Sequence, residues 1–218
     1  MRPLGAAELE LFLALPGRGG SRHPQLPYDF FDMVAAGHYR PAWTWVALRG
    51  GRLVARAAWW GAPDGDHPGL LDWFELGPDP DRVEAGAQLL RAAGQALRSE
   101  DGRRPEYQLF LPADWRERPE LGAAIRDQLE AAGRAGMELL DERRRYEWTP
   151  AAGLPERSRR LRFRPVGPGD TDELLAALAE ISRGSLDIHT AREVARVGVE
   201  QAALARRLGL DQPAELES

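Results

Sequence analysis

The run WTWVALRGGRLVARAAWW, residues 43–60, decides the class of fold. Its two halves are rich in residues that favour β-strands, and Gly50-Gly51 between them can adopt the positive φ angles that a tight hairpin needs. The run therefore predicts two strands, 43–48 and 53–60, that pair antiparallel.

A third strand and a helix follow the hairpin. The loop 63–68 is rich in Asp and Gly and leads into the apolar run 70–76, which Gly77-Pro78 ends. Asp81 and Glu84 have the spacing of an N-cap and its third helical residue. After them, apolar residues recur on one helical face at Val83, Ala87, Leu90, Gly94 and Leu97. The sequence thus predicts a strand, a short loop and a helix.

Further elements are predicted on both sides of this centre. Upstream we expect helices over 8–15 and 28–36, separated by a loop over 17–27 that is rich in Gly, Pro and Arg. Downstream we expect a buried strand over 107–111, a helix over 120–132 closed by Gly136, and an edge strand over 137–148.

The opening of the chain is repeated near residue 164. Arg2-Pro3-Leu4-Gly5 precedes an acidic helical stretch, and Arg164-Pro165-Val166-Gly167 again precedes an acidic cap and a helix over 170–181. Such a repeat indicates two copies of one domain in tandem. We expect a first copy over 1–148, a linker over 149–160, and an incomplete second copy over 161–218. The second copy is predicted to contain a strand over 161–166 and two helices, the latter one starting at the capping box Thr190-Ala191-Arg192-Glu193.

Composition excludes several classes of function. The 218 residues include no cysteine, and the four histidines lack ligand spacing, so we expect no disulfide, thiolate or metal site. The net charge of −5 disfavours nucleic acid as a partner. Two basic clusters, 143–145 and 157–164, fit either a solvated surface or an acidic or phosphorylated partner. No apolar run is long enough for a membrane helix and no signal core is present, so we expect a cytoplasmic protein.

The order strand, helix, helix, hairpin, third strand, short loop, helix, strand, helix, strand resembles the GNAT superfamily of acetyl-CoA-dependent N-acetyltransferases. The whole chain looks like the front part of a tandem GNAT protein of actinobacterial type. This resemblance implies an α/β (α+β) fold with a mixed, mainly antiparallel central sheet flanked by helices, followed by a partial second copy. It also implies acetyl-CoA as the cofactor and a small-molecule or peptide amine as the acceptor.

In GNAT enzymes a loop with the pattern Gln/Arg-x-x-Gly-x-Gly/Ala holds the cofactor pyrophosphate at a helix start, where unpaired amides attract anions. The matching stretch here is Arg82-Val83-Glu84-Ala85-Gly86-Ala87, with Leu76 on the strand before it. Ala85 replaces the first glycine of the pattern, and Asp79, Asp81 and Glu84 bring negative charge to the helix start. A cofactor loop and a well-capped helix with nothing bound both stay open.

The family's usual base is a carboxylate on the central strand. The resemblance makes Glu75 and Asp72 the candidates, and their spacing of three predicts opposite faces of the strand. An exposed acid at a strand end is the alternative reading of Glu75. The family's tyrosine, which protonates the thiolate, falls at Ala132, and the tyrosines at 107 and 146 are expected to serve packing.

Three of the seven tryptophans, Trp45, Trp59 and Trp73, fall on the hairpin and the third strand. They could line an aromatic cleft for a hydrophobic or cationic substrate, or they could pack between the sheet and its helices.

Two functions therefore follow from the sequence. The first is an acetyl-CoA-dependent N-acetyltransferase acting on an unidentified amine. The second is a catalytically silent GNAT-like domain that serves acyl-CoA binding, substrate binding or assembly. The segment 161–210 is expected to pack on the first copy, or on the same segment of a second chain as a homodimer, because so short a segment buries too little apolar surface alone. We expect residues 161–166 to add to a sheet edge and the following apolar side chains to be buried: Leu174, Leu178, Val194, Val197 and Leu204.

Overall fold

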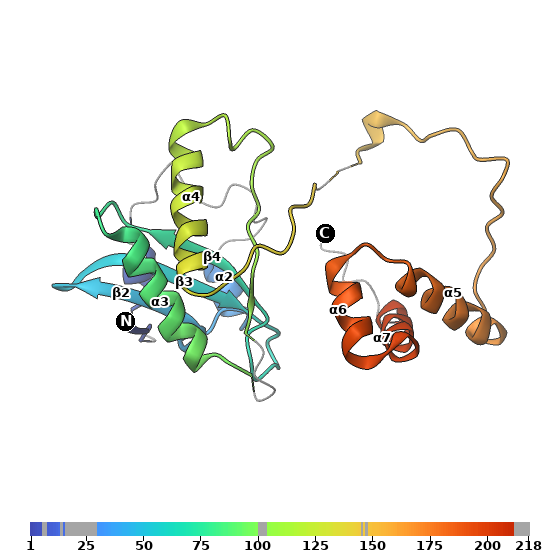
Figure 1. Cartoon of the computed structure of the whole chain (residues 1–218), viewed down its shortest axis with the longest axis horizontal. Coiled ribbons are helices and arrows are strands. Elements are labelled where there is room, and N and C mark those ends of the chain that lie inside the picture. Colours follow the sequence, from blue (N-terminus) through green and yellow to red (C-terminus); the bar gives the residue numbers. More distant parts are fainter. Residues whose placement is uncertain are drawn as a thin grey trace. The chain divides into compact units, whose positions relative to one another are not determined.

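The computed structural model describes residues 1–5, 8–13, 15, 30–99, 104–144, 146 and 148–211. Two compact units make up the chain, Met1–Leu139 and Leu140–Ser218. Figure 1 shows the sheet and its helices in the first unit and a group of helices in the second. The predicted loop over 17–27 lies outside the described residues.

The first unit contains a five-stranded sheet. Its strands are β1 (Arg2–Pro3), β2 (Thr44–Arg49), β3 (Arg52–Trp60), β4 (Leu70–Leu76) and β5 (Glu106–Tyr107). They lie in the order β1-β2-β3-β4-β5, with antiparallel pairing from β1 to β4 and parallel pairing between β4 and β5. The predicted mixed, mainly antiparallel sheet is therefore confirmed.

The hairpin forms as predicted. Gly50 and Gly51 have φ angles of 55° and 79°, which residues with a Cβ rarely adopt. Two β-bulges interrupt the ladder: Val54 is the extra residue between β2 and β3, and Asp72 is the extra residue between β3 and β4. A bulge changes the face to which a side chain points, and the one at Asp72 affects the candidate site.

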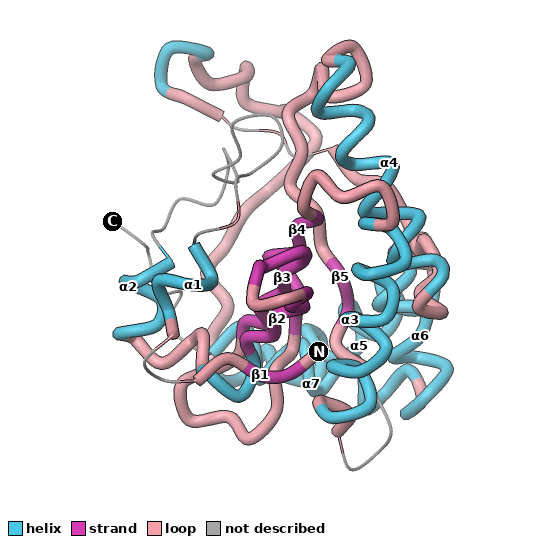
Figure 2. The backbone as a smooth tube through the Cα atoms, turned by 90° about the vertical axis from the view of Figure 1, so that its left-hand side faces the viewer, coloured by secondary structure: helices cyan, strands magenta, loops and turns pink. Residues whose placement is uncertain are grey.

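Helices cover both faces of the sheet. Figure 2 shows α1 (Leu9–Leu13) and α2 (Phe30–Ala35) on one side of the strands and α3 (Arg82–Ala96) and α4 (Pro119–Arg134) on the other. Each of these helices falls within a predicted helical range or within two residues of one. Gly136, with φ 85°, ends α4, and the Met137 amide returns to the Ala132 carbonyl at 3.0 Å.

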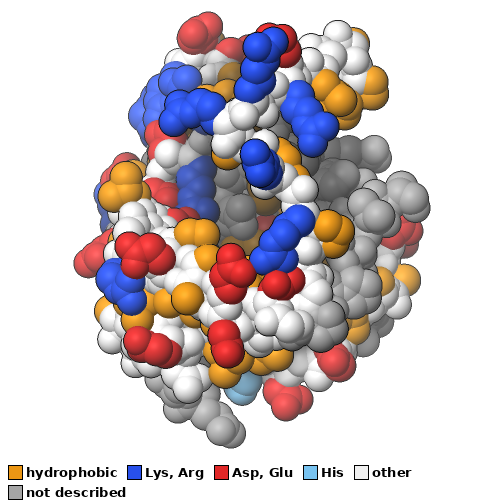
Figure 3. Space-filling view, turned by 90° about the vertical axis from the view of Figure 1, so that its right-hand side faces the viewer, with side chains coloured by type: hydrophobic (Ala, Val, Ile, Leu, Met, Phe, Trp, Pro, Cys, Tyr) orange, Lys and Arg blue, Asp and Glu red, His pale blue; other side chains and the backbone are white. Residues whose placement is uncertain are grey.

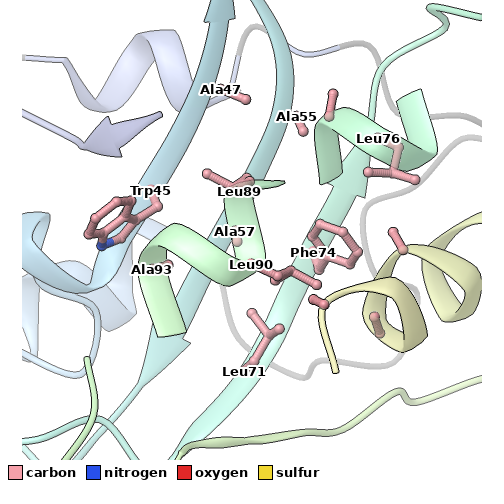
Figure 4. Close-up of a cluster of buried hydrophobic side chains, with 14 of the residues drawn as sticks. Trp45, Ala47, Ala55, Ala57, Leu71, Phe74, Leu76, Leu89, Leu90 and Ala93 are labelled. Carbon is pink, nitrogen blue, oxygen red and sulfur yellow. The ribbon is translucent and has the colours of Figure 1, made fainter. Parts of the chain in front are cut away.

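The two faces of the sheet bury two separate cores. The α3-side core contains Trp43, Trp45, Ala47, Val54, Ala55, Ala57, Trp59, Leu71, Phe74, Leu76, Ala85, Leu89, Leu90, Ala93, Leu97, Ala131, Ala132 and Ala135. The α1-side core contains Leu4, Phe12, Leu15, Phe30, Tyr39, Val46, Leu53, Ala58 and Trp73. In Figure 4, Leu89 and Leu90 of α3 lie against Ala55 and Ala57 of β3 and Phe74 of β4. These small alanines let the helix approach the sheet closely.

Two predicted strands do not form, and a third is short. Among the described residues of 137–148, and throughout 161–166, the backbone belongs to no strand. Leu139 is 79% exposed and Phe163 is 75% exposed, so no neighbouring strand covers these side chains. The strand predicted over 107–111 is limited to Glu106 and Tyr107.

The described residues of the second unit form three α-helices rather than the predicted two: α5 (Thr171–Arg183), α6 (Ile188–Val197) and α7 (Val199–Asp211). The predicted start at Thr190 is wrong, because Asp187 is the N-cap and accepts the Thr190 amide at 2.8 Å. Gly198, with φ 86°, separates α6 from α7. The N-cap at Asp187 thus moves the start of the helix, and Gly198 divides the range that we predicted as one helix.

Small and polar side chains fill the interior of the second unit. Its buried residues are Ser182, Thr190, Ala202 and Ala203, whereas Leu204, which we expected to be buried, is 40% exposed. Figure 3 shows one face of the molecule, on which hydrophobic side chains reach the surface between arginines and acidic side chains. Of the basic clusters, Arg143 pairs with Asp141 and Asp187, and Arg145 lies outside the described residues.

The repeated opening forms the same hydrogen-bonded arrangement twice, and we call it the arginine lock. In the first lock, Arg2 pairs with Glu8 at 2.6 Å, and the Gly5 amide donates to the same carboxylate at 2.8 Å. In the second lock, Arg164 pairs with Asp170 at 2.7 Å, and the Gly167 amide donates to it at 2.7 Å. The spacing is the same in both, and a helix follows each carboxylate.

Gly86→Ala should destabilise the first unit. A Cβ at Gly86 would lie 2.4 Å from Leu76 Cδ2 and 2.9 Å from Phe74 Cζ, and overpacking of this kind costs about 1–3 kcal/mol. Gly94→Ala is the matched control, because it lies in the same helix with no atom within 4 Å of the added Cβ. There the gain in helix propensity should stabilise the unit by up to ~1 kcal/mol. Urea unfolding followed by tryptophan fluorescence checks both, and equal effects of the two substitutions would contradict the packing.

The first lock should be visible in a pH titration. The bonds from Arg2 and from the Gly5 amide lower the pKa of Glu8 from its usual 4.5 to about 2. Because the folded pKa is the lower one, the lock's stabilisation is complete above the usual glutamate range and is lost as the pH falls toward 2. Carboxyl NMR should show Glu8 titrating near 2 in the native chain and higher in Arg2→Ala. A Glu8 that titrates alike in both proteins would contradict the lock.

Candidate functional site

The bulge at Asp72 brings both candidate carboxylates to one face of the sheet. We expected Asp72 and Glu75 on opposite faces, and this expectation is wrong. Trp59 pairs with Leu71 and Ala58 pairs with Trp73, so Asp72 is an extra residue that shifts the alternation. Asp72 therefore points, like Glu75, toward the side covered by α1 and α2.

Glu75 is buried against an arginine. Arg56 Nε donates to Glu75 Oε2 at 2.8 Å, a second guanidinium nitrogen contacts the same oxygen, and a third contact reaches the carbonyl of Phe12. The two side chains are 4% and 6% exposed. The guanidinium carbon also lies over the rings of Phe12 and Trp73, at 5.1 and 5.6 Å from their centroids. A base must meet its substrate, and this carboxylate instead meets a buried cation beneath α1.

Asp72 lies beneath aromatic side chains. The Tyr39 hydroxyl donates to Asp72 Oδ2 at 2.7 Å, and the aspartate is 1% exposed. Phe30 stacks on Tyr39 at 5.1 Å and meets Trp73 edge to face at 5.3 Å. The α1-side core thus encloses a polar group of Tyr39, Arg56, Asp72 and Glu75 among aromatic rings.

The expected cofactor residues form the packed start of α3. Ala85 and Ala87 are buried, Val83 packs on the α3-side core, and Gly86 faces Leu76 and Phe74 of β4. Arg82 binds Asp127 of α4 at 2.6 Å. Glu84 accepts from Gln88 at 3.1 Å and from Arg91 at 3.3 Å. The glycine thus serves the close approach of α3 to the sheet.

The hairpin turn neutralises the acids that precede α3. Arg49 holds Asp81 at 2.9 and 2.5 Å, and Arg52 holds Asp79 at 2.5 Å. The bonds from these arginines lower the pKa values of both aspartates. Asp81 occupies the N-cap position as predicted, but its side chain makes no capping bond. An anion at this helix start would have to compete with Asp79 and Asp81 for the arginines.

The three candidate tryptophans do not meet in one cleft. Trp45 and Trp59 belong to the α3-side core, and Trp73 belongs to the α1-side core on the opposite face. Trp45 is 8% exposed and its indole donates to the Ala42 carbonyl at 3.1 Å. The structure places all three in packing roles.

Gln128, for which we expected no role, and Tyr107, which we expected to serve packing, lie at the edge of β4. The pairing with β5 covers only Leu70 and Leu71, with a last bond from the Gln108 amide to the Leu71 carbonyl at 2.9 Å. Farther along, Gln128 of α4 donates to the Phe74 carbonyl at 2.7 Å, in the place of a strand. Tyr107 donates to Gln128 at 3.4 Å. Burial, and then the charge of Glu75, raises the pKa of the Tyr107 phenol well above its usual value.

Arg56 was also missed, although a signal for it existed. It is a charged residue inside the apolar run 53–60, opposite another charged residue, Glu75, in the apolar run 70–76. Among the residues that the structure describes, no group of His, Cys, Asp and Glu could hold a metal ion. Within the same residues, no helix is both long and apolar enough to cross a bilayer.

Searches with models of protein families, among curated proteins and among solved structures each found no match to this chain. The resemblance to GNAT proteins thus stays a prediction that rests on the order of the elements.

Removing one member of the buried ion pair should be far more costly than removing both. Glu75→Leu leaves the Arg56 charge unpaired, which typically costs ~3–5 kcal/mol. The double variant Arg56→Met/Glu75→Leu should recover most of this loss, because apolar residues can replace a buried pair. Asp81→Ala at the exposed pair with Arg49 is the control, and it should have little effect on stability, because exposed ion pairs contribute little. Urea unfolding measures all three, and equal effects of Glu75→Leu and Asp81→Ala would contradict the buried pair.

Proposed function

We propose that the first unit is a catalytically silent, GNAT-like domain that serves binding or assembly. The observation that carries this proposal is the burial of Glu75 beneath α1 in contact with Arg56. A general base needs access to the amine whose proton it removes. Glu75, the strongest candidate base, is instead paired with Arg56 and covered by α1.

The start of α3 supports the same proposal. Pyrophosphate binding at a helix start uses free amides and small residues that leave room for the ligand. Gly86 lies instead against Leu76 and Phe74, and Asp79 and Asp81 hold the two arginines of the hairpin turn. These contacts are those of a helix that has been fixed to its sheet.

A second candidate is an acetyl-CoA-dependent N-acetyltransferase acting on an unidentified amine. It is favoured by Tyr107, whose phenol lies beside the part of β4 that β5 leaves unpaired. A protonated phenol is the group that a departing thiolate would need.

Calorimetry with acetyl-CoA, combined with a thiol-release assay on a set of amines, separates the two candidates. A silent domain should release no thiol above the uncatalysed rate, and Glu75→Gln should leave the rate of thiol release unchanged. An enzyme should bind acetyl-CoA, and Glu75→Gln should lower its turnover by ~100-fold or more, the usual scale for a lost general base. Turnover with that loss would overturn the silent assignment. Binding of acetyl-CoA without turnover would identify the silent domain as an acyl-CoA-binding module.

A further inference from the structure

The two arginine locks differ in what covers them. In the first, the chain that leads into the lock lies on the sheet edge: Arg2 and Pro3 form β1, opposite Val46 and Trp45, and the Leu4 amide donates to the Thr44 carbonyl at 2.7 Å. Leu4 is 4% exposed. The second lock holds Arg164, Pro165 and Val166 in the same local arrangement, but Val166 is 59% exposed and these residues form no strand. The second lock therefore holds residues 164–166 in the arrangement that precedes the first helix, but these residues pair with no other strand.

We propose that residues 161–166 of one molecule pair with β2 of a second copy of this chain, in the register of β1 and in its place. The inference deepens the proposed role in assembly by naming the partner. In this pairing Arg164 lies opposite Val46, Pro165 lies opposite Trp45, and the Val166 amide donates to Thr44. Val166 then occupies the buried position of Leu4.

The position of the proline fits this register. In an antiparallel ladder, hydrogen-bonded and non-hydrogen-bonded pairs alternate. Because Leu4 and Thr44 form a bonded pair, Pro3 falls at a non-bonded position, where its missing N–H costs nothing. Pro165 is one residue before Val166, as Pro3 is one residue before Leu4, so the second lock satisfies the same requirement.

The incoming segment can cover more of β2 than β1 does. The chain at β1 contacts only Thr44, Trp45 and Val46 of the six residues of β2, and among the described residues no strand pairs with this edge at 47–49. Continuing the register places Phe163 opposite Ala47, Arg162 opposite Leu48 and Leu161 opposite Arg49.

Burial of apolar surface favours this replacement of β1 by residues 161–166 of a second copy, which we call the exchange. Side chains alternate between faces along a strand, so Phe163 and Leu161 would lie on the face of Trp45 and Ala47, beside α3. Phe163 is 75% exposed and Leu161 is 57% exposed in the single chain. The exchange removes both from water, which favours the pairing.

Charge disfavours the simplest rival, in which two copies of 161–166 pair with each other. An antiparallel pair centred on Phe163 would put Arg162 of each strand opposite Arg164 of the other. Like charges directly opposite destabilise a sheet. On β2 the same positions meet the apolar Leu48 and Val46. If both molecules exchange, the two identical contacts close a dimer.

The absence of cysteine from the chain allows a direct test of the register. Chains carrying only Leu48→Cys are mixed with chains carrying only Arg162→Cys, oxidised, and analysed by mass spectrometry. The two Cα atoms should be about 5.5 Å apart in a hydrogen-bonded pair, a separation that suits a disulfide. Leu129→Cys, at a surface position of α4, replaces Leu48→Cys in the control mixture.

We expect the mixed disulfide between residues 48 and 162 to form in a yield well above that of random pairing. The disulfide between residues 129 and 162 should form in a yield at or below that of random pairing. A statistical yield of the 48–162 disulfide would overturn the exchange, and so would an equal yield from the control. A contact of 161–166 with β2 within one chain gives no mixed disulfide and also overturns it.

The mass in solution gives a second, independent measurement. Light scattering should show a dimer that dissociates on dilution, and Phe163→Asp should shift it to monomer at concentrations where the native chain is dimeric. Leu186→Asp is the control, because Leu186 is fully exposed between α5 and α6, outside the exchanged segment. A monomer at every concentration, or a dimer that Phe163→Asp leaves intact, would refute the proposal. Thiol release by the dimer would refute only the silent assignment, so the two failures are distinguishable.

Discussion

A guanidinium group lies buried between the sheet and α1, where Arg56 contacts Glu75 on the neighbouring strand and the carbonyl of Phe12. Taking both charges out of water costs several kcal/mol per ion, so the pair specifies the arrangement more than it stabilises the fold. Arg56 and Glu75 are direct partners in the β3–β4 ladder. A slip of β4 by one residue would turn Glu75 toward the apolar α3-side core and away from Arg56, so the pair fixes the register of the two strands. The contact of Arg56 with the Phe12 carbonyl fixes the position of α1.

The bulge at Asp72 places the charged side chains and most of the apolar side chains of β4 on opposite faces of the sheet. It lets Leu71 and Phe74 face α3 while Asp72, Trp73 and Glu75 face α1. The carboxylates of β4 are therefore on the opposite face from Leu76 and Gly86, the residues expected near a cofactor. Chemistry between a base on one face and a thioester on the other would need the edge of β4 to be open. At Phe74 that edge is occupied by Gln128.

Local signals predicted the centre of the sheet well, since Gly50-Gly51 and the run 70–76 specify their own structure. The rest depended on contacts that a sequence does not display. The bulge at Asp72 arises from pairing with β3, and the sequestration of Glu75 needs Arg56, nineteen residues away. The segments 137–148 and 161–166 were predicted to be strands, but a strand also needs a sheet edge to pair with. The single helix predicted from Thr190 onward failed for a local reason, because Gly198, with a positive φ angle, separates α6 from α7.

The arginine lock explains how a fragment of sheet can be prepared before its partner is present. All its bonds lie within seven residues, from Arg2 to Glu8 or from Arg164 to Asp170, so the chain can form it without any tertiary contact. In both locks the arginine, and then the glycine amide, lowers the pKa of the carboxylate. The lock does not itself supply apolar cover. Such cover buries Leu4 to 4% exposure in the first unit, whereas Val166 in the second unit is 59% exposed. An edge strand that is ordered locally but uncovered loses little chain entropy on pairing. It therefore needs few additional contacts to bind, and Phe163 and Leu161 are in the position to provide them.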